Sequence, residues 1–175
     1  MPSPAVERLT RRYPGAVSTE LRTPRVTVEI PRIGARRDAC VDRLARMLQA
    51  QVGDLAIVRV HGSLALSSES EPRPDITVLR WRRDFYAEEL PSPRDVLLVV
   101  EVEEISGETD RQRAHSHARA GISETWAIDL SAGRIEEFSD PNPGGYAYSH
   151  TQERGDTLRI AALPHVEIDV AATLG

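Results

Sequence analysis

The segment LLVVEVEEIS, Leu97–Ser106, decides the fold, because it begins as an apolar run and then presents three acids in four residues. Such a run is typical of a strand that is covered on both faces, so we expect this strand near the centre of a sheet. Side chains alternate along a strand, and Glu101 and Glu103 therefore point to the same face. Acids are rarely buried without a partner, so an arginine, a metal ion or solvent is expected beside them.

The composition is that of one compact globular domain over residues 1–175. The chain has 40% hydrophobic and 28% charged residues, which is ordinary for a globular protein and argues against disorder. Its 22 basic and 27 acidic residues give a net charge of −5, which opposes nonspecific coating of nucleic acid but leaves room for a local basic patch. All 22 basic residues are arginine, so no mechanism can use a lysine amine.

The sequence also indicates the compartment. No window approaches the roughly 18 uninterrupted apolar residues of a membrane span. The first residues lack the apolar core of a secretory signal, so we expect no membrane partner and a cytoplasmic location. The single Cys40 cannot form an internal disulfide and is interpreted as a small core residue.

The order of the predicted elements indicates an α+β fold with a mixed sheet flanked by helices. Two turn segments, 129–133 and 141–145, predict hairpins that extend the sheet on one side. Helices are expected at residues 4–12, 35–52 and 109–120, and strands at 25–30, 55–60, 64–66, 75–79, 96–102, 125–129, 133–138, 147–152 and 157–163.

Three carboxylates are expected at one end of this sheet. Asp75 follows a proline and begins the apolar segment that precedes the acidic strand, so pairing of the two strands brings it to Glu101 and Glu103. Mutual repulsion of three acids is commonly relieved by a divalent cation, and Mg²⁺ prefers such oxygen ligands. A metal held there activates water for phosphodiester hydrolysis. The alternative is a solvated strand end with Asp75 as a strand-start cap.

Six segments of the chain occur in an order that resembles a known family. The resemblance is to the putative restriction endonuclease family called Uma-two, in the PD-(D/E)xK nuclease superfamily, and it covers residues 20–163. It implies a restriction-endonuclease-like fold and Mg²⁺- or Mn²⁺-dependent cleavage of DNA. The matching segments are RPDITVL, LLVVEVEEIS, TDRQRAHSHARAGISETWAID, RIEEF, GGYAY and GDTL.

The resemblance also assigns metal ligands. Asp75 and Glu101 match the metal-binding acids of the family, and Glu20 matches an acid before its first strand that adds an outer carboxylate. Glu103 stands where the superfamily motif usually has lysine. The resemblance implies that it orients or deprotonates the attacking water, as an acid near a metal can.

The chain departs from the family on the helix after the acidic strand. The usual lysine is replaced by Arg113, which cannot accept a proton but can stabilise charge on a phosphate. His117 lies one helical turn later, on the same face, and is the second expected contributor. His115 points to nearly the opposite side, so the two histidines cannot share one ion.

A basic segment offers a candidate surface for nucleic acid. Three arginines surround Trp81 on the segment after the Asp75 strand, which we expect to lie near Asp75, and two arginines that begin the helix at 35–52 add to this patch. A solvated arginine-rich surface is the alternative. The predicted nucleic-acid-binding residues are Arg80, Arg82, Arg83, Arg36 and Arg37.

Two functions follow from these observations. The first is a Mg²⁺-dependent endonuclease that hydrolyses DNA with a metal-activated water, expected as a homodimer because cutting both strands requires two sites related by a twofold axis. The second is a catalytically inactive nuclease-fold module that binds nucleic acid or a protein partner.

Overall fold

The structure, a computed structural model, describes residues 34–67, 70–104 and 108–175. The predicted helix at 4–12, the predicted strand at 25–30 and Glu20 lie outside the described residues. The helices are α2 (Ala35–Val52), α3 (Glu108–Ala120) and α4 (Val170–Leu174), with single 3-10 turns at Gly53–Leu55 and Pro93–Asp95. The strands are β1 (Ala56–Val60), β2 (Ile76–Arg80), β3 (Val96–Glu103), β4 (Glu124–Asp129), β5 (Arg134–Asn142), β6 (Gly145–Gln152), β7 (Thr157–Ile160) and β8 (Leu163–Asp169).

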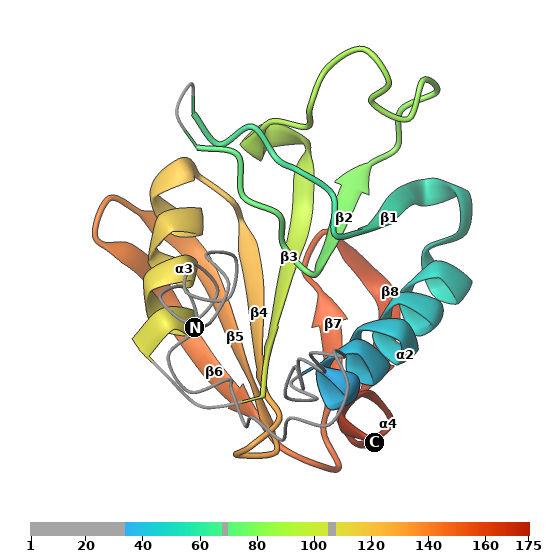
Figure 1. The fold of residues 1–175 in the computed structure, drawn as a ribbon, viewed down its shortest axis with the longest axis vertical. Helices are drawn as coiled ribbons and strands as arrows, with labels where there is room; N and C mark the ends of the chain where they lie inside the picture. The colour runs from blue at the N-terminus through green and yellow to red at the C-terminus, as the bar shows by residue number, and fades with distance from the viewer. Residues whose placement is uncertain (1–33, 68–69, 105–107) are drawn as a thin grey trace, which may run out of the picture. The chain divides into compact units, whose positions relative to one another are not determined.

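Six strands form one mixed sheet in the order β1-β2-β3-β4-β5-β6. All neighbours are antiparallel except β3 and β4, which run parallel and are connected through α3. This arrangement confirms the α+β prediction, the interior position of β3 and the two hairpins that extend the sheet beyond β4. In Figure 1, α2 and α3 lie on opposite sides of β3.

The alternation of β3 divides the core into two parts. Leu98, Val100 and Val102 face α2, whereas Val99 belongs to a smaller cluster on the other face, with Ile122 after α3. Glu101 continues the second set, so the acidic end of β3 faces away from α2 and toward α3. Burying each large aliphatic side chain contributes about 2 kcal/mol, which fixes this register strongly.

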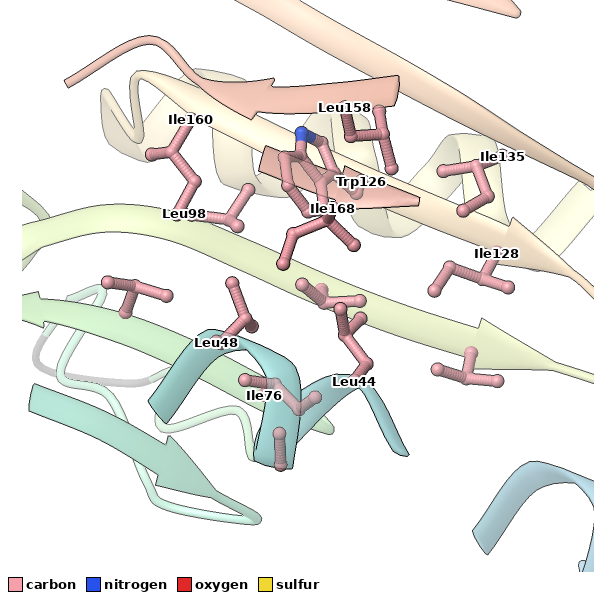
Figure 2. Close-up of a cluster of buried hydrophobic side chains, with 14 of the residues drawn as sticks. Leu44, Leu48, Ile76, Leu98, Trp126, Ile128, Ile135, Leu158, Ile160 and Ile168 are labelled. Carbon is pink, nitrogen blue, oxygen red and sulfur yellow. The ribbon is translucent and has the colours of Figure 1, made fainter. Parts of the chain in front are cut away.

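The larger cluster lies between the sheet, α2 and the β7–β8 hairpin (Figure 2). Trp126 and Cys40 are fully buried in it, as the sequence predicts for core residues. Other fully buried members that Figure 2 labels are Leu44, Leu48, Ile76, Leu98, Ile128, Ile135, Leu158, Ile160 and Ile168.

The C-terminal segment differs from the prediction of one strand at 157–163. The chain turns after Ile160, and β7 pairs with β8 as a separate two-stranded sheet, followed by α4. Leu158 and Ile160 on β7, with Val166 and Ile168 on β8, alternate with exposed residues, so each strand buries one face. Asp169 caps α4 by accepting from the Ala172 amide at 2.6 Å.

The predicted short strand at 64–66 is wrong. This segment folds back on the following one, because the Leu64 amide donates to the Pro72 carbonyl at 3.0 Å and the Leu66 amide to the Ser70 carbonyl at 3.0 Å. Proline has no amide hydrogen and cannot complete a ladder on that side. The folded-back loop leads directly to Asp75.

None of the described helices is long and apolar enough to cross a membrane.

Candidate functional site

The ends of β2 and β3 bring Asp75 next to Glu101. The antiparallel register pairs Ile76 with Val100, so the residues that follow in each direction are Asp75 and Glu101. The Val102 amide donates a 2.8 Å hydrogen bond to Oδ2 of Asp75. The predicted pairing of these two strands is therefore confirmed, and the carboxylate of Asp75 lies against the backbone of the acidic strand.

Asp75 is fully buried and already has a cationic partner. Nη2 of Arg37 forms an ion pair with Oδ1, and Nδ1 of His61 lies 3.5 Å from the same oxygen. Nε of Arg37 also donates to the Val102 carbonyl at 3.0 Å. Arg37 and Asp75 together therefore bind both the N–H and the C=O of Val102.

The last acid of the EVEE sequence holds the start of α2. The two carboxylate oxygens of Glu104 accept from the backbone amides of Gly34, Arg36 and Arg37, each at 3.2 Å. The first amides of a helix lack partners within the helix and carry partial positive charge, so a carboxylate stabilises them. Glu104 thereby positions the residue that reaches Asp75.

Arg113 on α3 is the partner of the other two acids. Its Nη1 lies 2.7 Å from Oε1 of Glu103 and 3.4 Å from Oε2 of Glu101. Glu101 is 6% exposed, and burial raises its pKa to about 7. Arg113 opposes that increase in pKa, whereas Asp75 and Glu103 reinforce it.

His117 is buried beside Glu101. Its Nε2 lies 3.7 Å from Oε1 of Glu101, and burial, with Arg113 nearby, lowers the pKa of the imidazole to about 4. Nδ1 is buried without a hydrogen-bond partner among the described residues. As predicted, His117 shares a face of α3 with Arg113, whereas His115 is exposed.

Arg37, Glu101, Arg113 and His117 line a cleft of about 470 Å³, whereas Asp75 and Glu103 are not among the described residues that line it. Among the described residues that line it, Glu101 is the only acid, and three arginines supply positive charge. An arginine-rich cleft with one buried carboxylate suits an anionic substrate such as a phosphodiester. The lining residues are Arg37, Leu66, Ser70, Pro72, Arg73, Glu101, Gln112, Arg113, Ser116 and His117.

A preformed metal site of three or more His, Cys, Asp or Glu side chains is absent from the described residues. The carboxylates are instead paired with guanidinium groups, with Arg37 at Asp75 and Arg113 at Glu101 and Glu103. The expected metal ligands, Asp75 and Glu101, lie at the adjoining ends of β2 and β3. Their metal-binding role stays a prediction.

Comparison with known proteins identifies the family to which this chain belongs. The sequence model of the Uma2 family, described as "Putative restriction endonuclease", matches residues 10–171. The chain belongs to the Uma2 family. A sequence comparison with curated proteins gives no significant match.

A solved structure shares the fold of this Uma2 protein. It is the crystal structure of a putative nuclease belonging to DUF820 from Anabaena variabilis, with a TM-score of 0.64 and 12% sequence identity. The match covers 79% of this chain and 80% of the other. At this identity the likeness establishes the shared α+β fold alone.

The arginines predicted to adjoin Asp75 on the following segment do not lie there. Arg80 ends β2, five residues beyond Asp75, and an extended strand covers about 16 Å over that length. Arg82 is paired with Asp84 at 2.6 Å and Glu89 at 2.8 Å. In Figure 1 the chain enters this loop from the far end of β2.

The other predicted residues have the following places. Nη2 of Arg36 donates to the Leu130 carbonyl at 3.3 Å, and Arg83 is exposed. A nucleic-acid-binding role for Arg36, Arg37, Arg80, Arg82 and Arg83 stays a prediction.

Sequence reasoning missed three residues of the site. His61 follows β1 and contacts Asp75, which is predictable only once β1 and β2 are known to pair. Glu104 caps a helix 70 residues away from it in sequence, and no local pattern indicates that contact. Arg73 lines the cleft from the folded-back loop, where Nε donates to Oγ of Ser63 at 3.0 Å.

Proposed function

We propose that this Uma2 protein is a divalent-metal-dependent endonuclease that hydrolyses phosphodiester bonds in DNA with an activated water. The observation that carries the proposal is Glu101, a buried acid with its pKa raised to about 7 that faces an arginine-lined cleft and adjoins Asp75 across two strands. Perturbed carboxylates in clefts are common at catalytic sites. Membership in a family described as restriction endonucleases supports the same reaction class.

The donor chemistry fits a hard cation. Asp75 and Glu101 offer oxygen ligands of the kind that Mg²⁺ and Mn²⁺ prefer. The raised pKa of Glu101 means that Arg113 compensates its buried charge incompletely, so a further positive charge there is favourable. When bound, the metal neutralises charge on the phosphate and increases the acidity of the water.

The chain's own residues would then divide the remaining tasks. Glu103, with a side chain 24% exposed, orients the water and accepts its proton. Arg113 contacts the phosphate and carries no proton away, because a guanidinium stays charged at neutral pH. Arg73, which also lines the cleft, binds an adjacent phosphate. His117 stays neutral and adds no charge to the lining of the cleft.

A plasmid assay tests the proposal. Incubation with Mn²⁺ is expected to convert supercoiled plasmid to nicked and linear DNA, and Glu101→Ala is expected to abolish the conversion. Glu153→Ala, a substitution at an exposed acid after β6, is the matched control and should cut at the rate of the unchanged protein. Equal cleavage by Glu101→Ala would assign the activity to another site or to a contaminant.

One observation favours the inactive module. Each carboxylate of the proposed site already has an arginine partner, and Asp75 is buried with both oxygens engaged. Calorimetric titration separates the two functions. Mn²⁺ binding that Asp75→Asn abolishes supports the enzyme, whereas DNA binding that needs no metal and leads to no cleavage supports the module.

The homodimer is also a proposal. Cutting both strands of a duplex requires two sites, and a twofold axis is the usual way to supply them. Sedimentation equilibrium of the metal-free protein tests it, with a mass near 38.8 kDa, about twice the 19.4 kDa of one chain, as the expected result.

A further inference from the structure

The ion pair between Arg37 and Asp75 has consequences for metal binding. We propose that Arg37 is a built-in counter-cation that occupies the carboxylate of Asp75 and must leave it before a divalent metal can bind there. This inference rests on the proposed function, because it concerns the metal affinity of the same site. It assigns to Arg37 a role different from the nucleic-acid contact that the sequence suggests.

The contacts of Arg37 are those of a dedicated partner. Its guanidinium bonds Asp75 through Nη2 and the Val102 carbonyl through Nε, while Asp75 is fully buried and accepts the Val102 amide through its other oxygen. Because the planar guanidinium group donates to two acceptors at once, it is held in one orientation. The pair therefore neutralises Asp75 at the point where β3 reaches its acidic end.

The backbone delivers this guanidinium from a fixed position. Glu104 accepts from the amides of Gly34, Arg36 and Arg37, so the first turn of α2 is tied to the residue that follows β3. Glu104, which anchors the helix, directly follows β3, and Asp75, which receives its arginine, directly precedes the neighbouring strand β2. The backbone at Arg37 is therefore already held in place, and only its side chain has to be ordered when it binds Asp75.

The same side chain can also leave. Arg37 lines the cleft, and its side chain is 36% exposed, so the guanidinium can turn into solvent without repacking the core. A metal and a guanidinium both seek the negative charge of Asp75, and two cations at one buried carboxylate repel each other. Metal binding therefore includes the cost of displacing Arg37, which lowers the apparent affinity.

Calorimetric titration with Mn²⁺ in the absence of DNA tests the inference on four proteins. These are the unchanged chain, Arg37→Gln, Arg37→Lys and the matched control Arg46→Gln, which alters an exposed arginine on the same helix. Arg37→Gln is expected to bind Mn²⁺ about tenfold more tightly than the unchanged chain, a gain of about 1.4 kcal/mol. Arg46→Gln should stay within about twofold of the unchanged chain.

Arg37→Lys separates a metal-blocking role from a purely structural one. Lysine keeps the charge but has a single nitrogen, so it cannot hold Asp75 and the Val102 carbonyl as the guanidinium does, and an intermediate affinity is expected. A thermal melt in EDTA establishes that each variant is folded. If Arg37→Gln does not fold, the inference is decided by whether Arg37→Lys binds Mn²⁺ more tightly than the unchanged chain does.

The outcomes distinguish this inference from the proposed function. Equal or weaker Mn²⁺ binding by folded Arg37→Gln and Arg37→Lys, with clear binding by the unchanged chain, overturns the inference and leaves the metal-dependent function standing. No binding by any of the four proteins overturns both. Mn²⁺ binding by Arg37→Gln and by none of the other three proteins supports the inference most strongly.

Discussion

Nε2 of His117 lies 3.7 Å from Oε1 of Glu101, and both side chains are buried. This contact is not a stabilising ion pair. Burial raises the pKa of Glu101 to about 7 and lowers that of His117 to about 4, so the charged form of each group is disfavoured. The folded chain therefore holds an acid whose ionised form is disfavoured by burial, a feature common at functional sites.

Glu101→Gln should stabilise the metal-free protein while abolishing the proposed metal binding. At pH 8 the carboxylate is ionised in both the folded and unfolded states, and only the folded state bears the cost of burying that charge. The neutral amide avoids this cost, so the free energy of unfolding in EDTA should rise by on the order of 1 kcal/mol. Urea denaturation at pH 8 measures it.

The same substitution should have less effect at pH 5. There Glu101 is protonated in the folded chain, because its pKa is about 7, and the amide resembles the group that it replaces. Glu153→Gln, at an exposed position, should change the stability at neither pH. A loss of stability at pH 8 in Glu101→Gln would mean that the ion pair with Arg113 outweighs the cost of burial.

Arg113→Lys should retain DNA cleavage, whereas Arg113→Gln should lose it. Both ion pairs of Arg113 use the single atom Nη1, at 2.7 Å from Glu103 and 3.4 Å from Glu101, and a lysine ammonium has enough donors for both. Removing a charged group that stabilises a phosphate typically costs about 10²-fold in rate. Single-turnover plasmid cleavage with Mn²⁺ measures the two variants.

Arg119→Gln is the control for this comparison, since Arg119 is exposed on the same helix. Its rate should match that of the unchanged chain. Cleavage by Arg113→Gln at the unchanged rate would exclude Arg113 from contact with the phosphate.

The sequence predicted the elements whose signal is local. The apolar run of β3 fixed its interior position, and the helical spacing of Val41, Leu44 and Leu48 gave the bounds of α2 correctly. The proximity of Asp75 to the acidic end of β3 followed from the predicted pairing of two apolar strands, and the structure adds the register. Hydrophobic burial dominates these features, and its periodicity is visible without coordinates.

The partners of the acids could not be predicted in the same way. Arg37 reaches Asp75 across 38 residues and Glu104 reaches α2 across about 70, and charged contacts at such separations have no sequence period. The placement of Arg80 failed for a simpler reason. Arg80 is close to Asp75 in sequence, but the extended strand β2 separates the two residues in space.

Arg73→Gln should weaken DNA binding more than Arg83→Gln does. Arg73 lines the cleft beside Glu101, whereas Arg83 lies on the loop beyond the far end of β2. Loss of one phosphate contact should lower the slope of log affinity against log salt by about 0.9. Fluorescence anisotropy with a short duplex at several salt concentrations measures the slope.

Arg46→Gln, on the exposed face of α2, should leave that slope unchanged. A larger decrease for Arg83→Gln than for Arg73→Gln would place the DNA on the loop at residues 81–92. It would restore the sequence-based interpretation of the arginines that surround Trp81.

A second buried acid lies away from the site and has a structural role. Oε1 of Glu124 accepts from Nε1 of Trp126 at 2.7 Å, and Oε2 accepts from the Ala161 amide at 2.8 Å. Glu124 therefore joins β4 to the turn between β7 and β8. Burial raises its pKa to about 7, against the opposing effect of both hydrogen bonds.

This pKa gives the stability a definite dependence on pH. Between the ordinary value of 4.5 and about 7 the folded chain holds the proton of Glu124 and the unfolded chain does not, so the free energy of unfolding falls as pH rises from 5 to 8. The contribution of this group is on the order of 2 kcal/mol. Glu124→Gln removes the titration and should flatten the profile by that amount.

Glu124→Gln should also lower the stability at pH 5. The glutamine side chain has one oxygen, which can accept from either the indole of Trp126 or the backbone N–H of Ala161. The other N–H then faces the NH₂ group of the glutamine and loses its acceptor, which costs about 1–3 kcal/mol. Urea denaturation at pH 5 and pH 8 measures both effects, with Glu153→Gln as the control that keeps the full profile. An unchanged profile in Glu124→Gln would assign the pH dependence to Glu101 alone.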